Sequence, residues 1–133
     1  MDSVTVEGAE DLAAKPTVTV DTGADPPGDL ASEDLVQGEG QEVQAGDTAQ
    51  VQYVGVSWST GREFDSSWDR GAQPFSFPVG AGRVISGWDD GVVGMRAGGR
   101  RLLVIPPDQG YGDRGAGGVI APGETLVFVV DAL

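Results

Sequence analysis

The sequence predicts an α+β domain in which one short helix lies across a curved antiparallel sheet. From residue 48 onward, short segments that alternate apolar and polar residues follow one another, as in half-buried strands. Only residues 84–93 have the periodicity of an amphipathic helix. Glycine, at 22 of 133 residues, is typical of a sheet protein with many turns rather than of a helical bundle.

The strand-like segments differ in how clearly they alternate. In the first, Val51 and Tyr53 face one way, and Gln50 and Gln52 face the other. The last is the clearest, because Leu126, Phe128 and Val130 all face the same side. The predicted strands are residues 49–58, 62–67, 74–79, 101–105 and 125–130.

The predicted helix, residues 84–93, is short and depends on packing. Its apolar stripe consists of Ile85, Trp88 and Val92. Asp89 and Asp90 lie on the opposite side. Because Gly87 and Gly91 lower the intrinsic helix propensity, we expect contact with the sheet to stabilise this segment.

Charge is concentrated at the N-terminal end of the chain. The net charge is −13, of which −10 falls in residues 1–45, where Lys15 is the single base. We predict that residues 1–32 form an acidic, mainly extended arm, ordered in part at most, in which Thr17–Val20 adds a strand to a sheet edge. Residues 33–133 form the single compact domain. Such an arm is typical of a solvated segment, and the alternative is a tether for basic client proteins. The charge argues against nucleic acid as a partner.

Several kinds of chemistry are excluded by composition. The chain has no His and no Cys, so it has no Ser-His-Asp or Cys-His machinery and no cysteine-based zinc site. Asp65 and Asp69 lack the spaced partner ligands of a calcium loop. The glycines at 80–82 form a turn, because the Lys-Ser/Thr of a phosphate loop is missing. We therefore expect no metal and no cofactor. A small cluster of arginines, Arg96, Arg100 and Arg101, is interpreted as a solvated strand entry.

No apolar run approaches the roughly 18 residues of a membrane span, and the N-terminus shows no signal peptide. We expect a cytoplasmic monomer with no membrane partner; the alternative is export with the signal already removed.

Aromatic residues are the strongest candidates for a binding site. Trp88, in the middle of the helical stripe, can floor a cavity, whereas Phe77 is interpreted as core. The hydroxyls of Tyr53 and Tyr111 need partners if buried, with the backbone as the first alternative. Asp65 either caps the chain or pairs with a base, for which Arg70 is the nearby candidate. The long Gly/Pro loop at 106–123 is of a kind that is usually functional.

The order of these residues resembles the FKBP family of peptidyl-prolyl cis-trans isomerases, the tacrolimus-binding immunophilins. The resemblance covers residues 33–133 and implies a twisted antiparallel sheet of five or six strands wrapped around one short helix. It rests on six ordered motifs, Val51-Gln52-Tyr53-Val54-Gly55, Phe64-Asp65-Ser66-Ser67, Pro74-Phe75-Ser76-Phe77, Val84-Ile85-Ser86-Gly87-Trp88, the segment 105–112 and Leu126-Val127-Phe128.

The resemblance also implies roles for individual residues. Trp88 is the floor under a proline ring, and the Ile85 N–H and the Tyr111 hydroxyl hold carbonyl groups of substrate or drug. Implied catalytic residues are Tyr53, Phe64, Asp65, Trp88, Tyr111 and Phe128. Implied substrate- or drug-binding residues are Phe75, Val84, Ile85, Arg70 and Ile120. Two departures from the family pattern, Gln109 for an aromatic residue and Ala116-Gly117 for His-Pro, fall in the loop that overhangs the pocket.

The implied function is isomerisation of X-Pro bonds during protein folding. The implied partners are proline-containing peptides, unfolded client proteins and macrolides such as tacrolimus or rapamycin. Two alternatives are a binding module without useful turnover and a holdase-type chaperone. The short loops argue against the holdase, because no extra domain is inserted in them.

Overall fold

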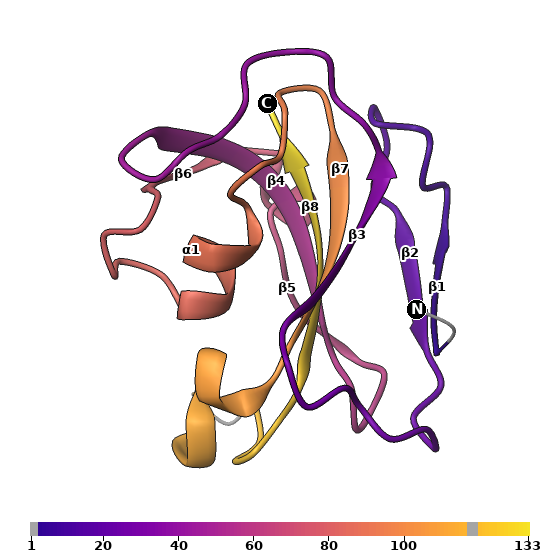
Figure 1. The fold of residues 1–133 in the computed structure, drawn as a ribbon. Helices are drawn as coiled ribbons and strands as arrows, with labels where there is room; N and C mark the ends of the chain where they lie inside the picture. The colour runs from indigo at the N-terminus through magenta and orange to yellow at the C-terminus, as the bar shows by residue number, and fades with distance from the viewer. Residues whose placement is uncertain (1–2, 117–119) are drawn as a thin grey trace.

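The fold is an antiparallel sheet with a helix on one face and a two-stranded hairpin on the other (Figure 1). The computed structural model describes residues 3–116 and 120–133. Within these residues the main sheet has six strands, in the order β3-β7-β8-β4-β5 with β6 also paired to β4, and the fold is α+β as predicted. The strands are β1 (Val4–Glu7), β2 (Thr17–Val20), β3 (Ala31–Val36), β4 (Thr48–Ser57), β5 (Glu63–Ser66), β6 (Phe75–Pro78), β7 (Arg100–Ile105) and β8 (Leu126–Ala132). The helices are α1 (Ser86–Gly91) and the 3-10 turns η1 (Trp68–Arg70), η2 (Pro107–Gln109) and η3 (Gly112–Arg114).

The five strands predicted from alternation are all present, and no end is shifted by more than two residues. β4 pairs with three strands, because its length lets β6 pair along its first half and β5 along its second half, while β8 pairs along its other edge. A register shift between Gly55 and Val56 leaves Phe64 as an extra residue in β5, where that strand pairs with β4. β8 lies between β4 and β7 and is buried along its whole length.

The helix is shorter than predicted, Ser86–Gly91 in place of 84–93, because Ile85 has an extended conformation (φ −57°, ψ 146°). Its two glycines have a packing role. A Cβ on Gly87 would lie 2.5 Å from Ile105, and one on Gly91 would lie 2.8 Å from Leu103. Because neither residue has a side chain, the helix backbone packs directly against β7. This close packing explains why two glycines occur in the helix although they lower its intrinsic stability.

Both faces of the sheet are apolar. Alternate residues of β8 pack under α1, as predicted for Leu126, Phe128 and Val130. The residues between them, Val127 and Val129, belong to a second buried cluster on the opposite face. Such a two-sided sheet needs a cover on each side.

The cover of the second face is the hairpin formed by β1 and β2, in which Val4 pairs with Val20. Both valines are 8% exposed and join the second cluster. The expected pairing of Thr17–Val20 with a sheet edge is therefore wrong, because this strand pairs with β1 and lies over the face of the sheet (Figure 1). The edge beside β7 is occupied by β3, which was not predicted because its sequence, Ala-Ser-Glu-Asp-Leu-Val, is mostly polar. The domain boundary at residue 32 stays a prediction.

The interpretation of Arg100 as a solvated residue is also wrong. Its side chain is fully buried and donates to Asp131 from Nε at 2.6 Å and from Nη2 at 2.8 Å. A buried guanidinium requires such partners, and Asp131 on the neighbouring strand supplies them. Among the described residues, no helix is long and apolar enough to cross a membrane.

Candidate active site

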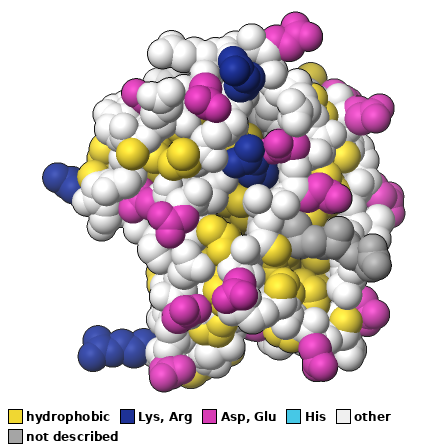
Figure 2. Space-filling view, in the orientation of Figure 1, with side chains coloured by type: hydrophobic (Ala, Val, Ile, Leu, Met, Phe, Trp, Pro, Cys, Tyr) yellow, Lys and Arg dark blue, Asp and Glu magenta, His cyan; other side chains and the backbone are white. Residues whose placement is uncertain are grey.

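A cavity of about 300 Å³ lies between α1 and the strands that it covers. On the face shown in Figure 2, hydrophobic side chains gather in the hollow beside α1, with acidic side chains scattered around them. The cavity is lined by Tyr53, Phe64, Asp65, Phe75, Arg83, Val84, Ile85, Trp88, Tyr111 and Phe128. Nine of these ten residues were assigned to the site from the sequence, and they come from five different elements and two loops.

Trp88 lies at the centre of the aromatic lining and is 5% exposed. Its ring centroid lies 4.9 Å from that of Tyr53, 5.2 Å from Phe128 and 5.8 Å from Phe75, each with an edge-to-face angle. Edge-to-face contacts of this kind stabilise aromatic clusters beyond the area that they bury. No described residue accepts a hydrogen bond from Trp88 Nε1, so ring packing alone orients the indole.

The wall formed by Phe64 and Phe128 depends on a glycine in β4. A Cβ on Gly55 would lie 2.6 Å from Phe64 Cζ and 2.7 Å from Phe128 Cε1. Without that atom the two rings meet at 5.4 Å, nearly perpendicular at 89°. Any side chain at residue 55 would push one ring out of place and narrow the cavity.

A polar network stands at one side of the aromatic lining. The Tyr53 hydroxyl donates to Asp65 Oδ2 at 2.6 Å, and Arg70 Nη1 donates to Asp65 Oδ1 at 2.5 Å. Arg70 Nη2 in turn donates to the Tyr53 hydroxyl oxygen at 2.6 Å. The predicted pairing of Asp65 with Arg70 is confirmed, and the Tyr53 hydroxyl is held by side chains rather than by the backbone. Arg70 therefore belongs to the site without lining the cavity.

This network sets the ionisation of both acids. Burial raises the pKa of Tyr53, and the hydrogen bond to Asp65 raises it further, against the opposing effect of Arg70. Burial also raises the pKa of Asp65, but hydrogen bonds from Tyr53 and Arg70 outweigh it and hold that pKa below its usual value. At neutral pH the carboxyl is therefore an anion and the phenol is protonated.

Two further polar groups at the cavity remain available to a ligand. Within the described part of the chain, the Ile85 N–H and the Tyr111 hydroxyl have no hydrogen-bond partner, and Tyr111 is 42% exposed. Asp89 fixes the loop that leads to Ile85 by accepting from Gly80 N at 2.9 Å and Gly82 N at 3.1 Å. Asp89 is therefore buried, and its expected position on the outer side of the helix is wrong.

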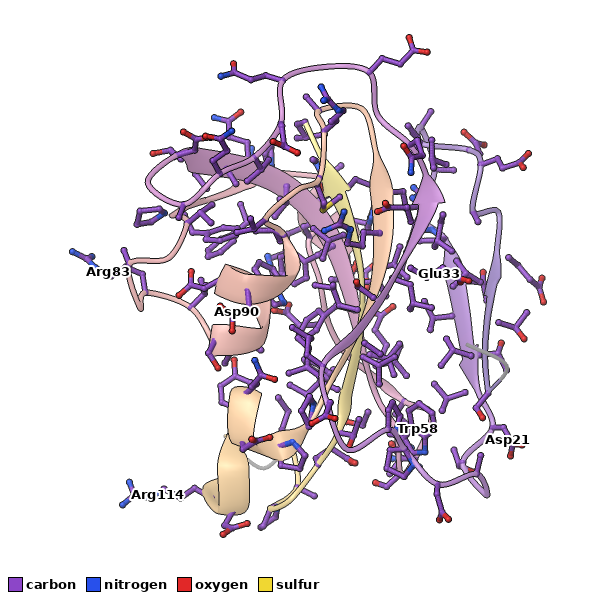
Figure 3. The ribbon with its side chains drawn as sticks, in the orientation of Figure 1. Asp21, Glu33, Trp58, Arg83, Asp90 and Arg114 are labelled. Atoms are coloured by element: carbon purple, nitrogen blue, oxygen red, sulfur yellow. The ribbon has the colours of Figure 1, made fainter. Side chains whose placement is uncertain are left out.

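Arg83 is the lining residue that the sequence analysis missed. It directly precedes the Val84-Ile85 motif, and this position next to the motif is the signal that could have identified it. Figure 3 shows its side chain directed away from the body of the protein, at the loop before α1. Its positive charge therefore lies on the outer side of a loop that lines the cavity.

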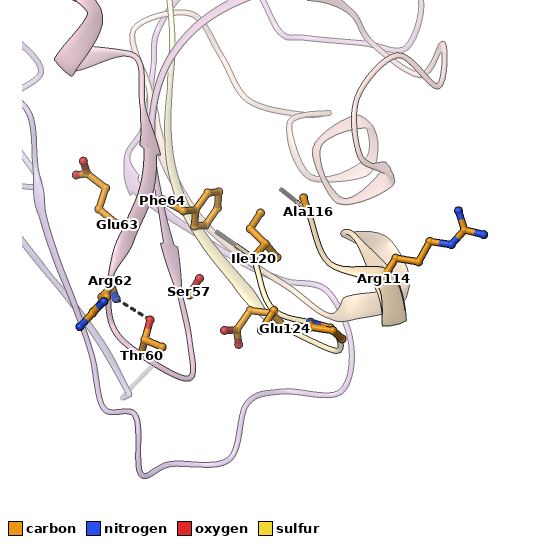
Figure 4. A pocket seen from close by; sticks show the side chains of 11 residues that line it. Ser57, Thr60, Arg62, Glu63, Phe64, Arg114, Ala116, Ile120 and Glu124 are labelled. Atoms are coloured by element: carbon orange, nitrogen blue, oxygen red, sulfur yellow. Dashed lines mark hydrogen bonds between the residues drawn. The ribbon is translucent and has the colours of Figure 1, made fainter. Parts of the chain in front are cut away.

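Ile120 is not brought into this cavity. It lines a neighbouring cavity of about 640 Å³, together with Ala116, and Phe64 lines both spaces (Figure 4). The larger cavity lacks the ring cluster and the two available hydrogen-bonding groups, so the smaller one is the candidate active site.

The two departures in the loop lie near α1 and at the loop tip. Gln109 Nε2 donates to Asp90 Oδ2 at 3.1 Å, and the Gln109 carbonyl accepts from Ser86 Oγ at 3.4 Å. This loop is thus attached to α1 by polar contacts in place of an aromatic ring. Ala116 forms a bridge with Ile120, whereas Gly117 lies outside the described residues.

The arrangement is suited to binding and shape recognition. Between residues 3 and 116 and between 120 and 133, no three acidic side chains gather in a metal-binding cluster. The cavity has an apolar floor, apolar walls, and donors at its edge, which suits a compact apolar ring with a carbonyl on either side.

Comparison with known proteins places these features in a family context. A family model described as FKBP-type peptidyl-prolyl cis-trans isomerase matches residues 39–133. An FK506-binding protein of Streptomyces anulatus is 62% identical over 110 residues, which cover 82% of this chain and 88% of that protein. A probable FK506-binding protein of Corynebacterium glutamicum is 46% identical over 119 residues, covering 90% and 97%.

Solved structures agree with these sequence relatives. The crystal structure of AtFKBP13 matches with a TM-score of 0.71 at 41% identity, over 77% of this chain and 90% of that one. A peptidyl-prolyl cis-trans isomerase from Pseudomonas syringae pv. tomato matches with a TM-score of 0.68 at 36% identity, over 78% and 73%.

Proposed function

Because this chain belongs to the FKBP-type peptidyl-prolyl cis-trans isomerase family and is such an isomerase, we propose that the Trp88-floored cavity is where it acts on X-Pro bonds. The observation that supports this proposal most directly is the ring cluster around Trp88, which borders a cavity of about 300 Å³. That volume can hold a prolyl ring with its flanking atoms.

The barrier to X-Pro rotation comes from amide resonance and amounts to about 18–20 kcal/mol. At 90° of twist the resonance is lost, and the amide becomes less polar than in either planar form. An apolar cavity disfavours the planar amide relative to water and so lowers the barrier. No covalent step and no proton transfer are needed, which is consistent with a chain that lacks His and Cys.

The aromatic and hydrogen-bonding residues of the lining have separate parts in this mechanism. Trp88 supports the prolyl ring, and Phe64, Phe75 and Phe128 enclose it. The Ile85 N–H and the Tyr111 hydroxyl donate to the carbonyls on either side of the proline. If these bonds fit the twisted amide better than the planar one, they add to catalysis by differential binding. Lowering the barrier by about 6–8 kcal/mol would accelerate rotation about 10⁴- to 10⁶-fold.

Asp65, with Tyr53 and Arg70, forms the polar side of the site. Because Arg70 neutralises Asp65, the carboxylate can accept a hydrogen bond at the rim without adding net charge to the cavity. Val84 completes the wall beside Ile85. We place Ile120 in the adjacent cavity, where it supports Phe64 rather than contacting the proline.

Binding of macrolides and of proline-containing peptides is a general property of the family, as the names of the relatives indicate. We propose that tacrolimus and rapamycin occupy the same cavity in this protein, and that its protein substrates are unfolded chains with slowly isomerising X-Pro bonds.

The test is cis-to-trans isomerisation of a short X-Pro peptide series, with and without rapamycin, for the wild-type protein and Tyr111→Phe. We expect turnover that rapamycin blocks, and a lower rate for Tyr111→Phe with an unchanged fold, because the hydroxyl has no partner among the described residues. Drug binding without turnover would make this a binding module. Turnover insensitive to rapamycin would place the active site elsewhere.

A further inference from the structure

The turn between β1 and β2 is attached to the main sheet by the buried side chain of Arg100. Besides its pair with Asp131, Arg100 Nη1 donates to the carbonyls of Gly8 at 2.9 Å and Ala9 at 3.3 Å. Arg100 Nη2 donates to the carbonyl of Ala14 at 3.1 Å. A buried guanidinium with all these acceptors leaves the turn little freedom, so the residue after Ala14 has a defined position.

That residue is Lys15, the only lysine of the chain. Lys15 Nζ lies 2.7 Å from Glu63 Oε1 and donates to Asp69 Oδ1 at 2.9 Å and Oδ2 at 3.1 Å. Glu63 is the first residue of β5, and Asp69 lies in η1. Lys15 therefore bridges the two ends of one short segment, residues 63–69, from a part of the chain that is distant in sequence.

The segment carries part of the candidate active site. Phe64 and Asp65 lie inside it, and Arg70 follows Asp69 directly. Asp65 and Arg70 both bond the Tyr53 hydroxyl at 2.6 Å. The position of η1 relative to β5 thus decides whether Arg70 reaches both of its partners.

We propose that Lys15 is a positioning residue for the isomerase, which ties Glu63 to Asp69 and so keeps Asp65 and Arg70 in place on Tyr53. This inference rests on the proposed role of the Trp88-floored cavity. It also assigns a function to the N-terminal hairpin, which lies on the face of the sheet opposite α1 (Figure 1). The hairpin reaches the site through one side chain without entering the cavity.

Loss of the Lys15 charge has a direct physical consequence. Glu63 and Asp69 both approach the same ammonium group, so without it two carboxylates face each other and repel. The pKa values reflect this arrangement. Hydrogen bonds to Glu63 and Asp69 outweigh burial and raise the pKa of Lys15, and the bond from Lys15 holds the pKa of Asp69 below its usual value.

The bridge is about one-third exposed at Lys15 and Glu63 and more exposed at Asp69. Exposed ion pairs contribute little to global stability, so the expected effect of losing it lies in turnover rather than in unfolding. This distinction separates a positioning residue from a residue that only stabilises the fold.

The experiment compares Lys15→Met with Lys15→Arg and with Arg62→Met, a matched control that removes one exposed positive charge whose side chain has no partner among the described residues. We expect Lys15→Met to lower kcat/KM for an X-Pro peptide about 3- to 10-fold, with a thermal midpoint within about 2 °C of wild type. Lys15→Arg should restore most of the rate, and Arg62→Met should match wild type.

A double-mutant cycle with Arg70→Gln tests the route. If Lys15 acts through Arg70, Lys15→Met should slow the Arg70→Gln protein no further. Equal slowing in both backgrounds, or a rate for Lys15→Met equal to that of the Arg62→Met control, would overturn the inference. The proposed function would survive that result, because wild-type turnover and its block by rapamycin are measured separately.

If Lys15→Met fails to fold, a triple variant that also carries Glu63→Gln and Asp69→Asn takes its place in the comparison. The two added substitutions remove the repulsion between the carboxylates. The inference is supported if the triple variant folds and turns over more slowly than wild type, and if the same three substitutions cause no further slowing in the Arg70→Gln protein. Wild-type turnover in the triple variant overturns it.

Discussion

Trp88 contacts four other aromatic rings, those of Tyr53, Phe75, Phe77 and Phe128. It therefore has two roles that a single substitution affects together, since it fills the core under α1 and floors the cavity. The indole N–H has no partner among the described residues, so the ring contributes through packing and not through a hydrogen bond.

Trp88→Ala should destabilise the protein by about 3–5 kcal/mol, because a large buried ring is replaced by a cavity. Trp88→Phe should cost less, since it keeps most of the ring contacts and loses no hydrogen bond. Urea unfolding measures both free energies. Equal losses for the two variants would mean that the indole N–H has a partner and that the role argued here is wrong.

The pH dependence of activity follows from the polar network. The pKa of Asp65 is held below its usual value and that of Tyr53 is raised, so neither group titrates near neutrality. We expect kcat/KM for an X-Pro peptide to vary little between about pH 6 and 8. A bell-shaped profile in that range would contradict the mechanism without acid–base catalysis.

The same network gives the sign of the effect at low pH. Because the pKa of Asp65 is lower in the folded protein than in the unfolded chain, its contribution to stability is present above the unfolded pKa. That contribution is lost as the pH falls through the folded pKa. Asp65→Asn, measured by the same unfolding assay, should therefore remove part of the loss of stability that wild type shows on acidification.

At the scale of elements, the helix and the hairpin are attached to the sheet in different ways. The helix α1 uses the absence of side chains at Gly87 and Gly91 to approach β7 closely. The hairpin uses the Arg100 side chain, and at its other end the carbonyl of Ala24 accepts from Trp58 Nε1 at 2.9 Å. Figure 3 shows Trp58 on the hairpin side of the sheet, where its ring belongs to the second buried cluster.

Arg100→Met should destabilise the protein by about 3–5 kcal/mol, because it leaves the buried Asp131 carboxylate without its partner. Adding Asp131→Asn should recover part of that loss. Arg96→Met is the control, since Arg96 is exposed and bonds one carbonyl. Urea unfolding measures all three variants. A cost for Arg100→Met as small as that of the control would show that neither the pair with Asp131 nor the bonds from Arg100 to the hairpin turn stabilise the fold.

At the scale of the whole molecule, the acidic charge and the ligand cavity are separate features. Acidic side chains are spread over the face in Figure 2, whereas the cavity lining contains one carboxylate, and Arg70 neutralises it. We therefore expect the overall negative charge to affect solubility and encounters with charged molecules, and to have little effect on binding in the proposed site.

Rapamycin at about 100 times its dissociation constant should raise the thermal midpoint by about 10 °C, since binding to the folded state alone contributes about 2.7 kcal/mol to a protein of this length. Differential scanning fluorimetry measures the shift. Phe75→Ala should reduce it, because Phe75 is 38% exposed and walls the cavity. An unchanged shift in that variant would place the drug outside this cavity.

The five strand segments from residue 48 onward, the helix and nine of the ten residues that line the cavity could be predicted without the structure. Strand alternation is a local property, so Leu126, Phe128 and Val130 could be assigned to one face without knowledge of the fold. The site residues were recognised because six motifs occur in the order typical of one family. The order of several motifs indicates a fold, whereas a single motif does not.

Contacts between segments that lie far apart in the chain could not be predicted and became visible only in the folded protein. The burial of Arg100 depends on carbonyls of Gly8 and Ala14, and the position of Lys15 depends on Glu63 and Asp69. Neither contact follows from local periodicity, because an isolated arginine or lysine in a polar segment has the same pattern as a solvated one. The N-terminal hairpin covers the second apolar face of the sheet. This role could not be predicted, because the sequence does not show that both faces of the sheet are buried.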